Sequence, residues 1–153
     1  MAYNTKKNLD TRIVRIFNTY GPNMRANDGR AIPNFINQLI DNKPITVYGD
    51  GTQTRSFCYI DDTINGIYKV LNSNYSLPIN IGNPIENSII ELINILKKLI
   101  TSESEITYHK LPENDPKLRK PDISLAKSKI FWQPKVKLYD GLKKTIDYFY
   151  SIK

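Results

Sequence analysis

The chain has 153 residues, of which 40% are hydrophobic and 24% are charged, a composition typical of one globular domain rather than a disordered segment. Its single cysteine excludes a disulfide framework and a cysteine-based zinc site, and no apolar run approaches the ~20 residues that a membrane-spanning helix needs. The net charge is +7, but the lysines are scattered, so we expect a phosphate-bearing small molecule, and neither nucleic acid nor membrane, as the partner. A reducing cytoplasm is the expected location.

The first third of the chain shows strand and helix patterns in alternation. Alternating polar and β-branched residues predict a strand over 12–17 that ends in a turn at 18–22. Apolar residues at helical spacing predict a helix over 31–40. A short strand is expected at 45–48, and the glycines that follow it indicate a tight turn at 49–51.

A further strand is predicted at 57–60, which makes Cys58 a core residue rather than a reactive thiol. Asp61 or Asp62 is the expected N-cap of a helix that runs to about Leu71. Adjacent carboxylates can also perform acid/base catalysis, but a helix start explains this pair more simply.

The next strand is predicted at 78–81. Ser88 and Glu91 form a capping-box pattern ahead of an amphipathic helix over 89–100. A strand at 104–109 carries the single histidine, which cannot build a histidine-based metal site and is expected on a sheet edge.

The last part of the chain begins with a polar, proline-bearing loop at 113–121, after which Asp122 is expected to cap a short helix toward Ile130. A final helix is predicted over 138–150. Helices and strands alternate throughout, so the fold class is α/β. No G-x-G-x-x-G loop occurs in the chain, which indicates that the fold begins in the middle of a dinucleotide-binding architecture.

Four polar motifs can bind anions, although each also fits an ordinary turn or surface loop. Asn18 and Thr19 follow a strand, where open α/β sheets bind ligands. Arg30 follows an Asp-Gly turn, and Arg55 stands at the mouth of a strand. Arg119 precedes a proline that restrains its loop. Arginine binds phosphate oxygens in a bidentate manner, so these positions predict a phosphate site.

The motifs occur in a fixed order, at 15–22, 27–30, 47–57, 80–84 and 119–122. This order is similar to the C-terminal half of extended short-chain dehydrogenase/reductases. The Asn-Asp-Gly-Arg turn and the Arg-Lys-Pro-Asp loop look most like those of UDP-glucuronate decarboxylases. The resemblance implies a Rossmann-type fold represented by its last parallel strands and a small substrate-binding α/β subdomain. Residues 1–153 would form one substrate-binding region, with the N-terminal NAD-binding half absent.

The resemblance also implies which residues contact the substrate. Tyr3, Asn18, Tyr48, Arg55 and Arg119 match substrate-binding positions. Arg55 would face the diphosphate of a UDP-sugar, and Arg119 would face either the diphosphate or the sugar carboxylate. Tyr48 would lie near the nucleotide.

The same resemblance places Thr19, Arg25 and Arg30 near the cofactor NAD or the shared pocket. In the family, NAD oxidises C4 of UDP-glucuronate, the 4-keto sugar loses CO2, and reduction of the ketone gives UDP-xylose. A tyrosine and a lysine in a Tyr-x-x-x-Lys motif supply the base. The match at Tyr3 precedes the first strand too closely to be that motif. We therefore expect no catalytic residue in this chain and no turnover by it alone.

Three other functions remain open. The chain could belong to a nucleotide-sugar 4,6-dehydratase or 4-epimerase. It could be a non-catalytic module that binds a sugar nucleotide or another subunit, with an N-terminal half or a homodimer partner. A nucleic-acid binder is a further alternative, which a steep salt dependence of binding would reveal.

Overall fold

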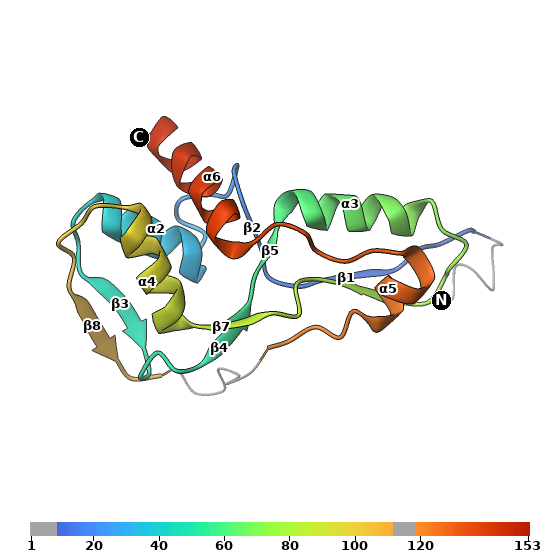
Figure 1. The fold of residues 1–153 in the computed structure, drawn as a ribbon, viewed down its shortest axis with the longest axis horizontal. Helices are drawn as coiled ribbons and strands as arrows, with labels where there is room; N and C mark the ends of the chain where they lie inside the picture. The colour runs from blue at the N-terminus through green and yellow to red at the C-terminus, as the bar shows by residue number, and fades with distance from the viewer. Residues whose placement is uncertain (1–8, 112–118) are drawn as a thin grey trace.

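The computed structural model describes residues 9–111 and 119–153 and shows an elongated molecule (Figure 1). One end carries β1, β6, α3 and α5, and the other carries β3, β8, α2 and α4. Helix α6 rises between the two ends. None of the helices in the described ranges is long and apolar enough to cross a membrane.

The first end is a parallel strand pair covered by helices. Its elements are β1 (Val14–Ile16), β6 (Ile79–Ile81), α3 (Ile60–Leu71) and α5 (Ser124–Ile130). Strands β1 and β6 pair in parallel, and α3, which directly precedes β6 in the chain, packs on both. The helix approaches the sheet closely because Gly66 has no side chain: a Cβ there would lie 2.8 Å from Ile81.

The other end holds the larger core. It contains α2 (Ala31–Ile40), β3 (Ile45–Tyr48), α4 (Ile89–Leu99), β8 (Ile106–His109) and α6 (Leu138–Ser151). Strands β3 and β8 pair in parallel. Leu39, Leu96 and Leu142 come from three different helices and are completely buried in one cluster. The apolar stripe of each helix therefore faces a common centre, as amphipathic helices require.

Two further strand pairs connect the ends. They are formed by β2 (Thr19–Tyr20), β4 (Thr54–Ser56), β5 (Cys58–Tyr59) and β7 (Glu86–Ser88). Strand β2 pairs in parallel with β5, and β4 pairs antiparallel with β7. Strand β2 pairs with β5, and β5 directly follows β4 in the chain. Asn18 and Thr19, which follow β1, are therefore brought close to the segment around Arg55.

Most predicted elements are confirmed. Helix α2 and strand β3 occupy the predicted residues, and the capping box of Ser88 and Glu91 is formed in both directions. Cys58 is completely buried, and burial raises the pKa of its thiol to about 11. His109 lies on β8, which pairs only with β3 among the described residues, so the edge position is also confirmed.

The predicted helix caps at Asp61 or Asp62 and at Asp122 are wrong. Helix α3 starts at Ile60, with Tyr59 at the N-cap and no side-chain cap. Asp62 is instead buried and accepts backbone N–H bonds from Lys135 and Val136. At α5 the N-cap is Ile123, while Asp122 accepts the backbone N–H of Ser124 at 2.8 Å.

Three short strands were not predicted. Strand β2 lies inside the predicted turn at 18–22, and β4 and β7 form where no strand was expected. Each is two or three residues long. Such strands exist because a distant segment pairs with them, and a local pattern of residues cannot reveal that partner.

Candidate functional site

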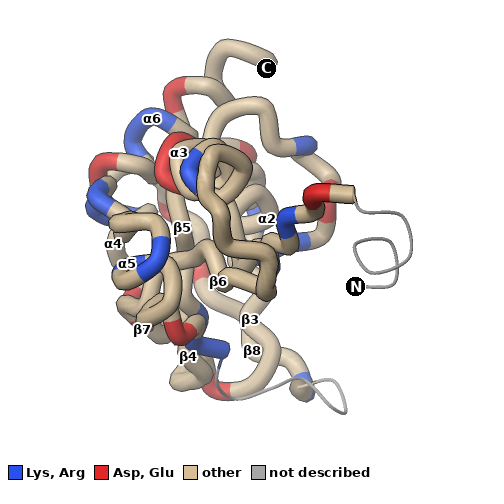
Figure 2. The backbone as a smooth tube through the Cα atoms, turned by 90° about the vertical axis from the view of Figure 1, so that its right-hand side faces the viewer, with Lys and Arg blue, Asp and Glu red and all other residues tan. Residues whose placement is uncertain are grey.

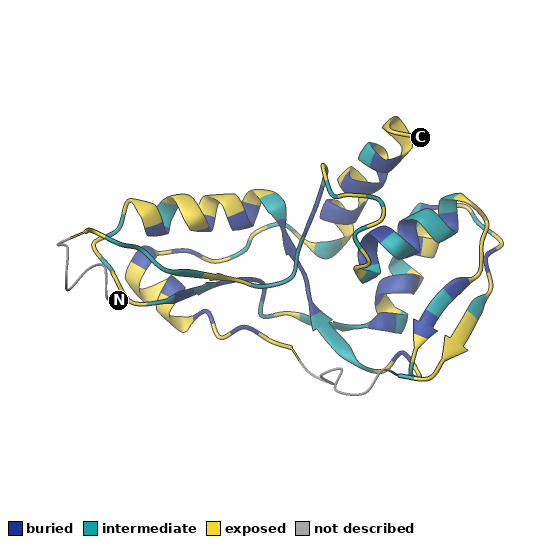
Figure 3. Cartoon of the chain, turned by 180° about the vertical axis from the view of Figure 1, so that it is seen from behind, coloured by how far each residue is buried: buried dark blue, intermediate teal, exposed yellow. Residues whose placement is uncertain are grey.

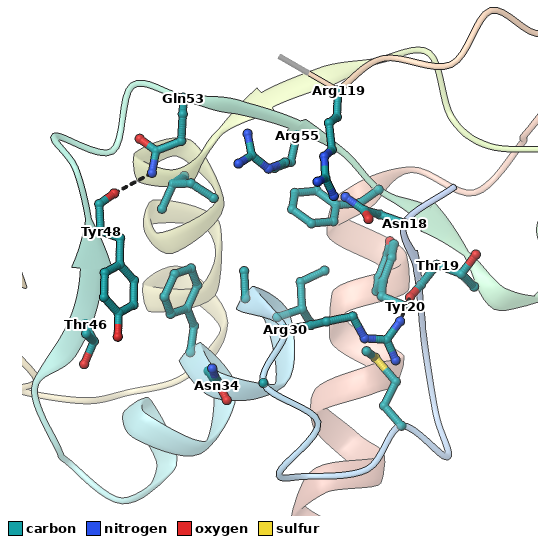
Figure 4. A pocket seen from close by; sticks show the side chains of 17 residues that line it. Asn18, Thr19, Tyr20, Arg30, Asn34, Thr46, Tyr48, Gln53, Arg55 and Arg119 are labelled. Atoms are coloured by element: carbon teal, nitrogen blue, oxygen red, sulfur yellow. Dashed lines mark hydrogen bonds between the residues drawn. The ribbon is translucent and has the colours of Figure 1, made fainter. Parts of the chain in front are cut away.

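A hollow of about 350 Å³ opens between α2, β3 and β4 (Figure 4). Its polar lining comprises Asn18, Thr19, Tyr20, Arg30, Asn34, Thr46, Tyr48, Gln53, Arg55 and Arg119. Phe35, Phe57 and Ile89 supply part of its apolar wall. Three lining side chains are arginines, and no aspartate or glutamate is among the described residues that line it. The hollow therefore favours an anion with an apolar portion.

Arg30 lies just before α2 and is held there by Asp28. Its Nε donates to the Asp28 carboxylate at 2.7 Å, and its Nη1 donates to the carbonyl oxygen of Thr19 at 3.2 Å. Burial opposes ionisation of Asp28, but the hydrogen bonds from Arg30 prevail and hold the pKa of that carboxyl below its ordinary value. The guanidinium is thus orientated by the turn that the Asp-Gly pair forms.

Arg55 is the central residue of β4, a strand that was not predicted, and does not stand at the mouth of the strand predicted at 57–60. Its Nη1 donates to the carbonyl oxygen of Thr54 at 2.8 Å. Arg119 is exposed, and the neighbouring Lys120 forms an ion pair of 3.4 Å with Glu86 on β7. Because β7 is the partner of β4, this ion pair holds the Arg119 loop beside Arg55. Figure 4 shows both guanidinium groups along one wall, next to Asn18.

Tyr48 lies on the opposite wall, at the end of β3. Its carbonyl oxygen accepts a 2.6 Å hydrogen bond from Gln53, which closes the intervening glycine turn. Its ring is half exposed and lies 5.8 Å from the ring of His109, centre to centre. A flat, partly exposed ring above an apolar wall can stack on a planar base.

A second hollow adjoins the first. It shares Asn18, Thr19, Arg30 and Arg119 with it and adds Ser56. The Ser56 hydroxyl is buried and has no hydrogen-bond partner within the described part of the chain. An unsatisfied buried hydroxyl is unusual in a folded protein, and this one stands at the boundary of a possible ligand site.

The structure brings together six of the eight predicted site residues: Asn18, Thr19, Arg30, Tyr48, Arg55 and Arg119. Arg25 lines a separate hollow beside Thr19 and Arg30. Tyr3 lies outside the described residues. Sequence reasoning did not select Ser56, although it lies within the motif at 47–57, or Asn34, which lies in the helix predicted at 31–40.

Neither Tyr20 nor Cys58 is suited to proton transfer. The Tyr20 ring is buried, and its hydroxyl donates to the carbonyl oxygen of Leu138 at 3.2 Å. Burial raises the pKa of this phenol far above its ordinary value, so the group stays protonated. The described residues contain no cluster of histidine, cysteine, aspartate and glutamate that could hold a metal ion.

Comparison with known proteins identifies the family. Residues 1–82 match the model of the NAD dependent epimerase/dehydratase family, which is more than half of the chain. This chain belongs to that family. The chain therefore has part of a Rossmann-type α/β fold, and the family to which it belongs is NAD dependent.

Sequence identity to individual curated proteins makes the comparison more specific. The chain is 47% identical over 148 residues to UDP-glucuronic acid decarboxylase 1 of Xenopus tropicalis and 47% identical over 140 residues to UDP-glucuronic acid decarboxylase 3 of Arabidopsis thaliana. These alignments cover 97% and 92% of this chain, but only 35% and 41% of the relatives. The chain thus spans little more than a third of their length.

A solved structure shows the same architecture. UDP-glucuronic acid 4-epimerase from Bacillus cereus, in complex with UDP-glucuronic acid and NAD, superimposes with a TM-score of 0.90 at 34% identity. The match covers 99% of this chain and 49% of the epimerase. The fold described above therefore corresponds to about half of an epimerase subunit.

Proposed function

We propose that this chain is the UDP-glucuronate-binding region of an NAD-dependent decarboxylase that makes UDP-xylose. The observation that carries the proposal is the hollow with Arg30, Arg55 and Arg119 on its walls and no carboxylate among its described lining residues. The 47% identity to UDP-glucuronic acid decarboxylases supports the substrate. Under this proposal, residues 1–153 act as one substrate-binding region.

The site residues take distinct roles. Arg55 and Arg119 bind the diphosphate, because two guanidinium groups on one wall match its two negative charges. Asn18 beside them donates its side-chain amide to the sugar or the phosphate. Tyr48 flanks the nucleotide on the other wall. Tyr3 is an additional substrate contact that we carry over from the family resemblance alone.

This chain supplies only a few residues near the edge of the cofactor site. Thr19, Arg25 and Arg30 are the residues that we assign to the vicinity of NAD. The Thr19 hydroxyl already donates to the carbonyl oxygen of Phe17 at 2.9 Å. The glycine loop that receives the NAD pyrophosphate does not occur in the sequence. These residues therefore do not suffice to bind NAD, and we propose that the chain alone binds the sugar nucleotide without converting it.

Calorimetric titration with UDP tests the binding role. We expect Arg55→Ala to weaken UDP binding by about 1.5–3 kcal/mol, the usual value of a charge-assisted hydrogen bond. Lys43→Ala is the matched control, because Lys43 is exposed and pairs with Asp41 away from the hollow. Equal affinities of the parent chain and Arg55→Ala would contradict the proposal.

A 4-epimerase is the second candidate, because the Bacillus cereus epimerase with UDP-glucuronic acid superimposes closely on this chain. Decarboxylation releases CO2 and leaves a pentose, whereas epimerisation keeps the carboxylate. The test joins the chain to the upstream half of the Xenopus relative and analyses the products from UDP-glucuronate. UDP-xylose with CO2 identifies the decarboxylase, and retention of the carboxylate identifies the epimerase. Conversion by the unjoined chain would overturn its proposed inactivity.

A further inference from the structure

Two hollows meet at the segment 131–137, which links α5 to α6. The first has a volume of about 340 Å³ and is lined by residues of α3, α5 and the linking segment. The second, of about 370 Å³, lies between that segment and the loop after β6. Lys127, Gln133 and Lys135 line both hollows, so the two form one continuous surface, which we call the linker surface. It shares no lining residue with the hollow that contains Arg55.

The linker surface is basic throughout. Lys69, Lys127, Lys135 and Lys137 line it, and no aspartate or glutamate is among its described lining residues. None of these four lysines forms an ion pair with another described residue. Helices α3 and α5 belong to the end of the molecule that faces the viewer in Figure 2, where lysine positions of both are blue. Cations that no carboxylate compensates favour an anionic partner.

Phe131 gives the first hollow an exposed apolar side chain. Its side chain is 84% exposed, and no ring of the described residues stacks on it. Its backbone has φ 49° and ψ 46°, a conformation that glycine adopts and phenylalanine rarely does. Lys69 donates to its carbonyl oxygen at 2.6 Å, which fixes this turn beside the hollow. The ring therefore serves neither the core nor the local backbone, and strained residues of this kind cluster at binding sites.

Ile85 gives the second hollow an exposed apolar side chain as well. It is 65% exposed, and its backbone N–H donates to the side-chain oxygen of Asn83 at 3.0 Å. The buried Asn83 amide donates in turn to the carbonyl oxygen of Phe57 at 3.1 Å, so the loop that carries Ile85 is fixed to the core. Helix α5, whose Lys127 lines both hollows, is the short and largely exposed helix on the left of Figure 3.

We propose that the linker surface binds a protein segment that is acidic and carries large apolar side chains. Its carboxylates pair with the four lysines, and its apolar side chains contact Phe131 and Ile85. Aromatic and aliphatic side chains among complementary charges are typical of protein-binding surfaces. Single-stranded nucleic acid also stacks on exposed rings, but Ile85 offers no ring to a second base. The proposal does not depend on the proposed function.

Fluorescence anisotropy with labelled synthetic peptides tests the surface on the full chain. The first peptide alternates glutamate with leucine, the second glutamate with serine, and the third lysine with leucine. Phe131→Ala and Lys127→Glu alter the surface. Lys98→Glu is the matched control for charge, because Lys98 is also an exposed helical lysine but lies on α4 and lines neither hollow. Arg55→Ala reports whether a peptide enters the nucleotide hollow instead.

We expect the glutamate–leucine peptide to bind more tightly than the other two. Phe131→Ala should weaken its binding by about ten-fold and Lys127→Glu by about five-fold. Lys98→Glu and Arg55→Ala should change it by less than about two-fold, since both sites lie apart from the surface.

Four results would overturn the proposal: no binding of the glutamate–leucine peptide, equal binding of the glutamate–serine peptide, equal effects of Lys127→Glu and Lys98→Glu, or a loss of binding in Arg55→Ala. Tighter binding of single-stranded polyuridylate that is lost in Phe131→Ala would overturn it too, because the surface would then belong to nucleic acid. UDP affinity should stay unchanged in Lys127→Glu, so failure of the proposed function is a separate result.

Discussion

The carboxylate of Asp62 accepts the backbone N–H of Val136 at 2.8 Å, which ties the first turn of α3 to a segment 74 residues later. The same oxygen accepts the N–H of Lys135 at 2.9 Å. Asp62 is 7% exposed, so these two N–H groups and the carboxylate satisfy one another away from water. This contact holds the segment at 135–136 against the first turn of α3.

Removal of that carboxylate should destabilise the fold. Asp62→Ala leaves two backbone N–H groups without their acceptor, and we expect the free energy of unfolding to fall by about 2–4 kcal/mol. Urea denaturation measures the change. Asp61→Ala, which alters an exposed neighbour in the same turn, should change stability by less than about 0.5 kcal/mol. Equal effects of the two variants would contradict the role of Asp62.

Phe131 ends α5 in the left-handed conformation, with φ 49° and ψ 46°, and its side chain is 84% exposed. The strain there is relieved by glycine, which adopts positive φ without a steric penalty. Phe131→Gly should therefore raise the free energy of unfolding by about 1 kcal/mol, despite the greater freedom of glycine in the unfolded chain.

Phe131→Ala is the control for this variant, because it removes the ring but keeps the strained backbone. Its thermal midpoint should stay close to that of the parent chain. A lower midpoint for Phe131→Ala would show that the ring makes a stabilising contact, and a lower midpoint for Phe131→Gly alone would contradict the expected relief of strain.

Ser56→Ala should stabilise the free chain. The buried hydroxyl has no partner within the described residues, so its removal relieves a desolvation cost of about 1 kcal/mol. Ser104→Ala is the matched control with the opposite sign. That hydroxyl is also buried, but it bonds to Ser102 at 2.8 Å and to the carbonyl oxygen of Gln38 at 3.4 Å. Denaturant titrations in which both variants lose stability would show that Ser56 is satisfied by water.

Arg119 should act on the diphosphate rather than on the sugar carboxylate. Arg119→Ala is then expected to weaken UDP and UDP-glucuronate binding by the same amount, about 1.5–3 kcal/mol. Calorimetry with UDP, UDP-glucose and UDP-glucuronate makes the comparison. A loss confined to UDP-glucuronate would assign Arg119 to the carboxylate.

The amino-acid sequence by itself determined the helices and the longer strands. The spacing of apolar residues located α2 and α6, and the reciprocal pattern of Ser88 and Glu91 located the start of α4. These signals are local, since each depends on residues within a few turns of the chain. The motif order also indicated the family and the arginines of the candidate site.

Only the tertiary structure decided how distant segments meet. Strand β4 exists because β7 pairs with it, and Asp62 is a buried acceptor rather than a cap because the segment at 135–136 folds back onto it. The grouping of Arg30, Arg55 and Arg119 likewise depends on three separate segments. The burial of the Ser56 hydroxyl also depends on contacts between segments that are distant in the chain. Pairing and burial arise from contacts between residues far apart in the chain, and a local pattern does not encode them.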